Sequence, residues 1–256
     1  MRLRQIAFAA RELAPAEDTL LYVLGLQTGF RDPGVGKFGL HNAVIPVGGN
    51  FLEIVAPVQD GTTAGRFLDR RDGDAGYMVI LQNEDAMPLR ARAEKLGIRI
   101  VWRHDNAGEC ASHFHPVDVG GVILSVDSFP QAQDLMVENA FWRWAGPDWE
   151  SHVGRDVIAA MTGVELVNAD PAKQAADWSS LLGLPALAKD DGFDIAMSDG
   201  GVIRFRPTLP GQLPGIRALD FRAADKAECL RRAAERGLPC GGDWFELMQV
   251  RCNLVD

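Results

Sequence analysis

A single carboxylate, Glu53, interrupts an apolar stretch whose pattern predicts a β-hairpin. Gly48-Gly49-Asn50 supplies the positive φ that tight turns need, and strands are expected at Ala43–Val47 and Phe51–Val55. Because side chains alternate along a strand, Glu53 lies on the opposite face from its two apolar neighbours. It is either at an exposed edge or in a pocket with a partner for its charge. A buried Glu with a raised pKa can act as a general base.

The histidines offer acid–base or metal chemistry at two places. His41 precedes the strand that pairs with the strand of Glu53 and could reach this carboxylate. His113-x-His115 would point both rings the same way in a strand, as a possible metal pair, but Pro116 favours a loop. His115 is either a loop histidine bonded to the main chain or a general acid/base or ligand anchor.

The sequence lacks the motifs of several other kinds of catalytic or binding site. No Gly-rich phosphate loop, Ser-His-Asp pattern or G-x-S-x-G elbow is present. Gly34-x-Gly36-x-x-Gly39 has the spacing of a dinucleotide fingerprint, but it does not open a helix. The four cysteines form no C-x-x-C pair, so free thiols are expected.

The net charge and the hydropathy of the chain limit the classes of partner that it can have. The net charge of -9, with no long basic block, argues against nucleic-acid binding. No apolar run approaches the ~20 residues of a membrane span, so no membrane partner is expected. The N-terminus leads straight into a strand-like pattern without signal-peptide features, which predicts a cytoplasmic protein.

One pattern occurs four times and positions these residues. A strand-like run leads to an acid, a helix follows, and Gly with an aliphatic residue ends it. Asp at a helix start accepts bonds from free N–H groups, and Gly takes the left-handed conformation at the end. Two or three strands follow each helix, and the last copy is shortened. The acids and their glycines are Glu12 and Gly25, Asp85 and Gly97, Asp170 and Gly183, and Asp225 and Gly237.

The stretch between the second and third copies matches no unit. It holds three tryptophans within eight residues, namely Trp142, Trp144 and Trp149, which are costly to leave in water. We expect them to plug a seam between the halves or to line a pocket mouth, by packing or by contacting a ligand. The predicted division is therefore one half at residues 1–128, a Trp-rich connector at 129–160 and a second half at 161–256.

Four βαβββ-like units in series resemble the vicinal oxygen chelate superfamily, also called glyoxalase/bleomycin-resistance/dioxygenase-like. His115-Pro116-x-x-x-Gly120-Gly121-Val122-Ile123-Leu124 is similar to the final-strand entry of methylmalonyl-CoA epimerases in that superfamily. The resemblance implies an α+β fold in which βαβββ modules form curved, open-barrel mixed sheets with helices outside. It also implies a divalent metal in the cup, held by His or Gln from first strands and Glu from last strands.

These ligand positions match only in part. In the first half they fall on Gln5, Glu53, Tyr77 or Met78, and Ser125, so at most two of four ligands survive. A catalytic zinc or iron needs about three protein ligands, whereas Mg²⁺ can use fewer. A divalent metal is therefore possible with an incomplete ligand set, and no metal ligands are assigned.

The same positions in the second half fall on Gly163, Arg204 and about Ala218, which form no ligand set. Arg204 either binds an anion or lies on a solvated face.

Three functions stay open from the sequence. The first is a glyoxalase-like isomerase, epimerase or lyase acting next to a carbonyl, with Glu53 and His115 as catalytic residues. The second is a binding protein of the same architecture that sequesters a small molecule. In the third, Glu53 and Gln5 merely satisfy each other in a core. The residues expected to contact the small molecule are Gln5, His41, Tyr77, Ser125, Trp142 and Trp144. The chain could also form a homodimer.

Overall fold

The computed structural model describes residues 1–256 and contains two mixed seven-stranded sheets, neither of which closes into a barrel. The predicted α+β class with repeated strand–helix–strand modules is confirmed. The first sheet has the order β2-β3-β1-β4-β7-β6-β5 and the second β13-β14-β12-β8-β11-β10-β9. The strands of the first are β1 Arg2–Ala9, β2 Leu40–Val47, β3 Asn50–Pro57, β4 Ala75–Gln82, β5 Ile100–Asn106, β6 Glu109–Phe114 and β7 Ile123–Ser128. Those of the second are β8 Ile158–Asn168, β9 Leu187–Lys189, β10 Gly192–Ala196, β11 Val202–Pro207, β12 Gly215–Ala223, β13 Trp244–Leu247 and β14 Val250–Val255.

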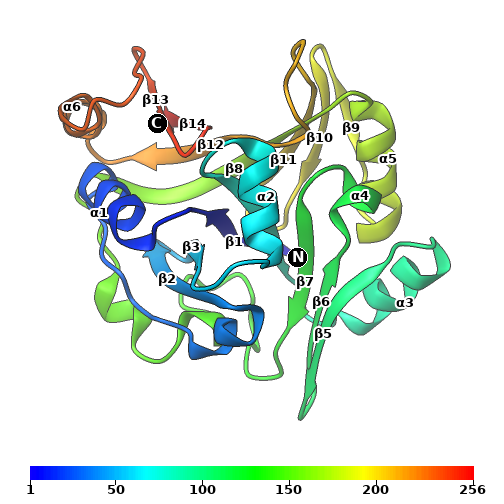
Figure 1. The fold of residues 1–256 in the computed structure, drawn as a ribbon. Helices are drawn as coiled ribbons and strands as arrows, with labels where there is room; N and C mark the ends of the chain where they lie inside the picture. The colour runs from blue at the N-terminus through cyan, green and yellow to red at the C-terminus, as the bar shows by residue number, and fades with distance from the viewer. The chain divides into compact units, whose positions relative to one another are not determined.

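Six α-helices and three short 3₁₀ helices complete the chain (Figure 1). The α-helices are α1 Leu13–Leu24, α2 Thr63–Arg71, α3 Met87–Lys95, α4 Pro116–Val119, α5 Pro171–Leu182 and α6 Lys226–Glu235. The 3₁₀ helices are η1 Pro33–Phe38, η2 Arg143–Ala145 and η3 Trp149–His152.

The chain divides into two compact units, each assembled from separate stretches of sequence. Unit one contains residues 1–4, 77–141 and 163–217, and unit two contains residues 5–76, 142–162 and 218–256. The division of the chain at residues 128 and 160 stays a prediction.

The predicted helix boundaries depend on local chemistry and are largely confirmed. The carboxylates of Asp170 and Asp225 each accept a hydrogen bond from a main-chain N–H three residues on, at 2.9 Å. Glu12 is at the N-cap of α1, but its side chain accepts no such bond. Asp85 lies two residues before α3 and accepts a hydrogen bond from the N–H of Met87, the first residue of that helix. The four predicted terminal glycines, Gly25, Gly97, Gly183 and Gly237, all have positive φ between 66° and 73°.

The β2–β3 hairpin of unit two positions Glu53. Gly48 has φ 59°, and the two strands pair antiparallel with Val44 opposite Glu53. On its other side β3 pairs with β1 in parallel, with Ala7 opposite Glu53. Glu53 therefore lies on an interior strand of the sheet, with a hydrogen-bonded strand on each side.

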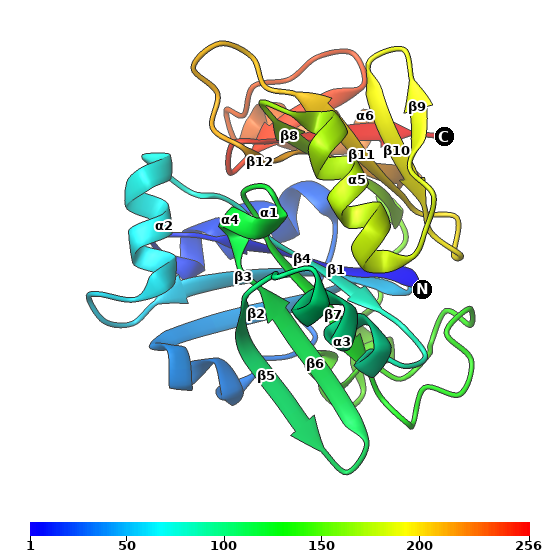
Figure 2. The same cartoon turned by 90° about the vertical axis from the view of Figure 1, so that its right-hand side faces the viewer.

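In unit one, the long β5–β6 hairpin continues the sheet beside β7 (Figure 2). Helix α5 lies along β10 and β11 (Figure 1). Its Trp178 is fully buried, donates from Nε1 to the main-chain oxygen of Val119 at 2.9 Å, and meets the ring of Phe205 edge-on with centroids 5.4 Å apart.

Replacing Trp178 by Phe removes this hydrogen bond and part of a buried ring. We expect Trp178→Phe to lower the free energy of unfolding by about 2 kcal/mol. Urea denaturation measures this loss. The matched control is Trp102→Phe on β5, where the indole is only half-buried. If Trp102→Phe lowered the free energy of unfolding as much as Trp178→Phe, the assignment of Trp178 to the core would be contradicted.

Candidate functional site

The carboxylate of Glu53 is buried and is held by two side-chain amides. Glu53 is 8% exposed, Gln5 1% and Asn42 2%. Asn42 Nδ2 donates to Oε1 at 2.6 Å, and Gln5 Nε2 donates to Oε2 at 2.8 Å. Of the two placements considered for Glu53, the structure shows the buried one with partners.

A second hydrogen bond orients each amide. The indole Nε1 of Trp142 donates to Oε1 of Gln5 at 2.7 Å, and the main-chain N–H of Asp32 donates to Oδ1 of Asn42 at 2.8 Å. With their carbonyl oxygens occupied, both amides turn their NH₂ groups toward Glu53. The result is a continuous chain of hydrogen bonds from Trp142 through the carboxylate to Asp32.

No cation compensates the charge of Glu53. Arg31 donates to the main-chain oxygen of Asn42 at 3.0 Å, but its guanidinium is bonded to both oxygens of Glu17 at 2.7 Å. Burial raises the pKa of Glu53 from 4.5 to about 7 against the opposing hydrogen bonds from Asn42 and Gln5, and the charge of Asp32 adds to the rise. Burial dominates because neutral donors replace only part of the lost hydration.

Tryptophans of the connector cover this part of unit two. Trp142 is 1% exposed, and Trp149 meets the ring of Phe51 edge-on with centroids 4.9 Å apart. A bridge between Val47 and Gly154 ties the same segment to the end of β2. The packing role considered for the tryptophans thus holds for Trp142 and Trp149, while Trp144 is half-buried in η2.

Ser125, Tyr77 and His115 belong to unit one. Ser125 is fully buried, and its Oγ lies 2.5 Å from Oδ1 of Asp127. Ser125 on β7 pairs in register with Ile80 on β4, so these two side chains lie on the same face of the sheet. Tyr77 is three residues before Ile80, so strand alternation places its side chain on the opposite face.

The two histidines of this region do not form a pair. His115 is the N-cap of α4, where its Nδ1 accepts from the N–H of Val117 at 3.1 Å. This is the loop histidine bonded to the main chain that the sequence allowed. His113 lies on β6 against the ring of Trp102, with centroids 4.4 Å apart.

His41 is exposed, and its neighbour Asn42 makes the contact to Glu53. Sequence reasoning missed Asn42, although a usable signal was present. A two-residue turn places Val44 opposite Glu53, and alternation then puts Asn42 on the same face.

The residues present do not fit a divalent metal. Oε1 of Gln5, the atom that would coordinate, accepts from Trp142, and both oxygens of Glu53 accept from amides. No group of three or more His, Cys, Asp or Glu side chains gathers anywhere in the chain. We therefore derive no step through a metal.

Comparisons with known proteins match the fold and not the sequence. No family model and no curated protein sequence matches the chain. A mutant of 4-hydroxymandelate synthase from Streptomyces coelicolor aligns with a TM-score of 0.69 and 14% identity over 94% of this chain and 75% of that one. A hypothetical protein from Staphylococcus aureus gives 0.65 and 9% over 99% and 98%. Methylmalonyl-CoA epimerase from Mycobacterium tuberculosis gives 0.44 and 21% over 49% and 86%.

The raised pKa of Glu53 predicts a dependence of stability on pH. The unfolded chain releases this proton near pH 4.5, whereas the folded chain holds it to about pH 7. The contribution is therefore fully present below pH 4.5 and is lost as the pH rises through 7.

Glu53→Gln removes this titration, so its stability relative to the wild type should rise by about 3 kcal/mol between pH 4.5 and pH 8. Urea denaturation of both proteins across this range measures the difference. A constant difference at all pH values would show that the pKa of Glu53 is not raised by folding.

Proposed function

Because the chain has the fold of the vicinal oxygen chelate superfamily, we propose that it is a small-molecule enzyme in which Glu53 acts as a general base. The reaction is removal of a proton from a carbon next to a carbonyl, as in an epimerisation or isomerisation. The observation that carries the proposal is the buried Glu53 carboxylate, held by two neutral amides and no cation, with a pKa of about 7.

A base with this pKa suits proton transfer near neutral pH. At pH 7 about half of the Glu53 carboxylates are ionised, and the proton they take is returned easily. In the forward step an oxygen of Glu53 bonds the proton, the C–H bond breaks, and its electron pair delocalises into the substrate carbonyl as an enolate. Return of the proton to the other face, or to the adjacent carbon, completes the reaction.

Gln5 and Asn42 are positioning residues in this proposal. Each donates to one oxygen of Glu53, so the amides fix the plane of the carboxylate. Trp142 and Asp32 act one step further away, because they fix the direction of the amides. A base held in this way loses little freedom when a substrate binds.

A purely structural pair of Gln5 and Glu53 explains this arrangement less well. The pair does form a hydrogen bond, as the third sequence hypothesis requires. A buried ion without a cation costs stability, however, and a core that needed only mutual hydrogen bonds between side chains could form them between neutral groups without that cost. Costly buried charges are concentrated at functional sites.

One observation favours the alternative of a non-catalytic binding protein. Both oxygens of Glu53 and the carbonyl of Gln5 already accept hydrogen bonds from the protein, and Glu53 is 8% exposed. An apolar or aromatic guest could bind beside this closed network without receiving or giving a proton.

Exchange of substrate hydrogen for deuterium tests the base directly. The protein in heavy water is mixed with acyl-CoA thioesters, 2-oxo acids or 2-oxoaldehydes, and NMR follows the hydrogen next to the carbonyl. We expect the wild type to exchange at least one of these, and Glu53→Gln to slow exchange by about 10²–10⁴-fold.

Glu17→Gln is the matched control, because Glu17 is also 8% exposed and in unit two but pairs with Arg31. It should lower stability and leave exchange unchanged. Exchange that persists in folded Glu53→Gln would refute the proposed role. Saturable binding without exchange in the wild type would favour the binding protein.

A small-molecule ligand, a cytoplasmic location and a possible homodimer stay part of this proposal. No helix of the protein combines the length and apolar character needed to span a membrane.

A further inference from the structure

The β13–β14 hairpin of unit two repeats the geometry of the hairpin that carries Glu53. A two-residue turn, Met248 and Gln249, joins its strands, and both residues have positive φ. Asn253 is the fourth residue of β14, as Glu53 is the fourth residue of β3. Both strands pair in parallel with the first strand of their module, and Asp220 on β12 lies opposite Asn253. Asn253 therefore occupies in the second sheet the position that Glu53 occupies in the first.

This hairpin has one apolar face and one polar face. Helix α6 packs against β13. The buried side chains of the apolar face are Phe245, Leu247, Cys252 and Leu254. Strand alternation places Trp244, Arg251 and Asn253 on the other face, where all three are half-buried. These side chains are sheltered, and a small molecule in solution can still reach them.

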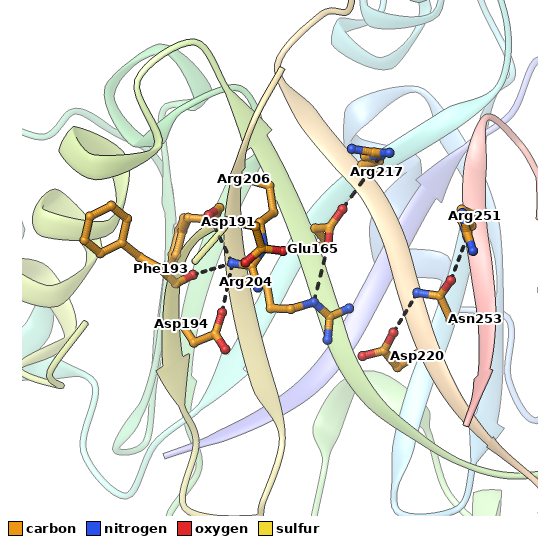
Figure 3. A network of polar contacts seen from close by, with 11 residues as sticks. Glu165, Asp191, Phe193, Asp194, Arg204, Arg206, Arg217, Asp220, Arg251 and Asn253 are labelled. Carbon is orange, nitrogen blue, oxygen red and sulfur yellow. Dashed lines mark hydrogen bonds and ion pairs between the residues drawn. The ribbon is translucent and has the colours of Figure 1, made fainter. Parts of the chain in front are cut away.

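A chain of contacts fixes the direction of the Arg251 guanidinium (Figure 3). Nδ2 of Asn253 donates to Oδ1 of Asp220 at 2.9 Å, which turns the carbonyl oxygen of Asn253 toward Arg251. That oxygen accepts a hydrogen bond from Nε of Arg251 at 2.8 Å. Asp220 is 7% exposed and takes part in further interactions, so it is firmly anchored. The amide of Asn253 thus relates a half-buried cation to a buried carboxylate.

The ring of Trp244 restrains the same guanidinium by a second contact. Cζ of Arg251 lies 4.6 Å from the ring centroid, which is a cation–π contact. The ring itself has little freedom to move, because it packs closely on Gly241. A Cβ added to Gly241 would lie 2.1 Å from Nε1 of the indole. Arg251 is therefore held by stacking as well as by a hydrogen bond.

The two Nη atoms of Arg251 remain available for a ligand. Nε donates to Asn253, whereas neither Nη atom has a hydrogen-bond or ion-pair partner in the protein. Glu246 lies opposite Arg251 on β13 and on the same face, but it forms no ion pair with Arg251. The edge formed by the two Nη atoms presents parallel N–H groups that match two oxygens of a carboxylate or a phosphate. An oxyanion can therefore bind this edge without breaking an existing ion pair.

We propose that Arg251 binds the oxyanion group of a small molecule, a carboxylate or a phosphate, and that Asn253 and Trp244 are positioning residues. The oxyanion accepts hydrogen bonds from both Nη atoms, while Nε stays bonded to Asn253. The exposed carboxylate of Glu246 repels the ligand and lowers its affinity. This site does not use Glu53, so either proposal can fail without the other.

NMR titration with acetate, benzoate and inorganic phosphate at constant ionic strength tests the site and distinguishes its two ligand classes. The reporters are the Nε–H signal of Arg251 and the indole N–H signal of Trp244. We expect saturable shifts of both signals with at least one of these anions. Arg251→Gln, followed on Trp244, should weaken binding by about tenfold or more. Arg222→Gln, which removes an exposed cation of β12 in the same unit, is the matched control and should leave binding unchanged.

Two further variants test the positioning residues. Asn253→Ala leaves the charge of Arg251 in place, yet it should shift the Nε–H signal of the free protein and weaken anion binding several-fold. Trp244→Phe keeps an aromatic face and should retain binding, whereas Trp244→Ala should weaken it. Anion binding that stays unchanged in both Asn253→Ala and Trp244→Ala would remove these residues from the site.

Glu246→Gln separates a binding site from a purely structural arginine. Removing the opposing charge should tighten anion binding several-fold if Arg251 serves a ligand. Weaker binding in Glu246→Gln, unchanged binding in Arg251→Gln, equal loss in Arg222→Gln, or no saturable shift in the wild type would overturn the proposal. Positions 246 and 251 lie outside the buried core, and circular dichroism confirms that these variants are folded.

Discussion

The carboxylate of Glu53 is held inside the protein by hydrogen bonds from two amide groups and by no cation. Three separate parts of unit two must be in place for this to hold. The hairpin register supplies Asn42, the parallel pairing of β1 and β3 supplies Gln5, and the connector supplies the indole of Trp142. A slip of one residue in either strand would turn an amide to the opposite face and leave the charge with one partner fewer.

Several other charged side chains of unit two have charged or polar partners. Both carboxylate oxygens of Glu17 accept hydrogen bonds from Arg31. Helices α1 and α6 lie side by side (Figure 1). They are joined at the surface by Arg236, which donates to Asp18, and by Tyr22, which donates to Glu235. Burial and the charge of Asp32 raise the pKa of Glu53 to about 7, against the hydrogen bonds from Asn42 and Gln5.

Local chemistry made much of the fold predictable. Gly25, Gly97, Gly183 and Gly237 end helices because only glycine takes a left-handed conformation without strain, and a sequence displays such residues directly. Helix α2 was not predicted. Thr62 caps it, and Phe67 and Leu68 are among its buried residues. Strand β6 was obscured by the alternatives considered for His113 and His115, which the sequence could not separate.

The partners of Glu53 were less predictable than its position. Gln5 is 48 residues away from Glu53, and Trp142 is 137 residues away from Gln5. No local pattern encodes contacts of this range. The resemblance to a known superfamily suggested Gln5 and Glu53 as neighbours, and the structure shows their hydrogen bond. Asn42 was within reach of register reasoning, but Trp142 was not, because the connector belongs to no repeated module.

The connector also sets the direction of the Gln5 amide beside Glu53. An amide can coordinate a cation through its oxygen or donate through its nitrogen, and its direction is set by whichever partner occupies the other end. Trp142 is a donor only, so it takes the oxygen of Gln5 and leaves the NH₂ group to face Glu53. That single indole N–H therefore turns the oxygen of Gln5, the atom that could coordinate a metal, away from Glu53 and the NH₂ group toward it. At the matching position of β11, in the second sheet, the side chain is that of Arg204 and carries the opposite charge. Modules that share a register thus differ in chemistry because of a few polar side chains and the segments that orient them.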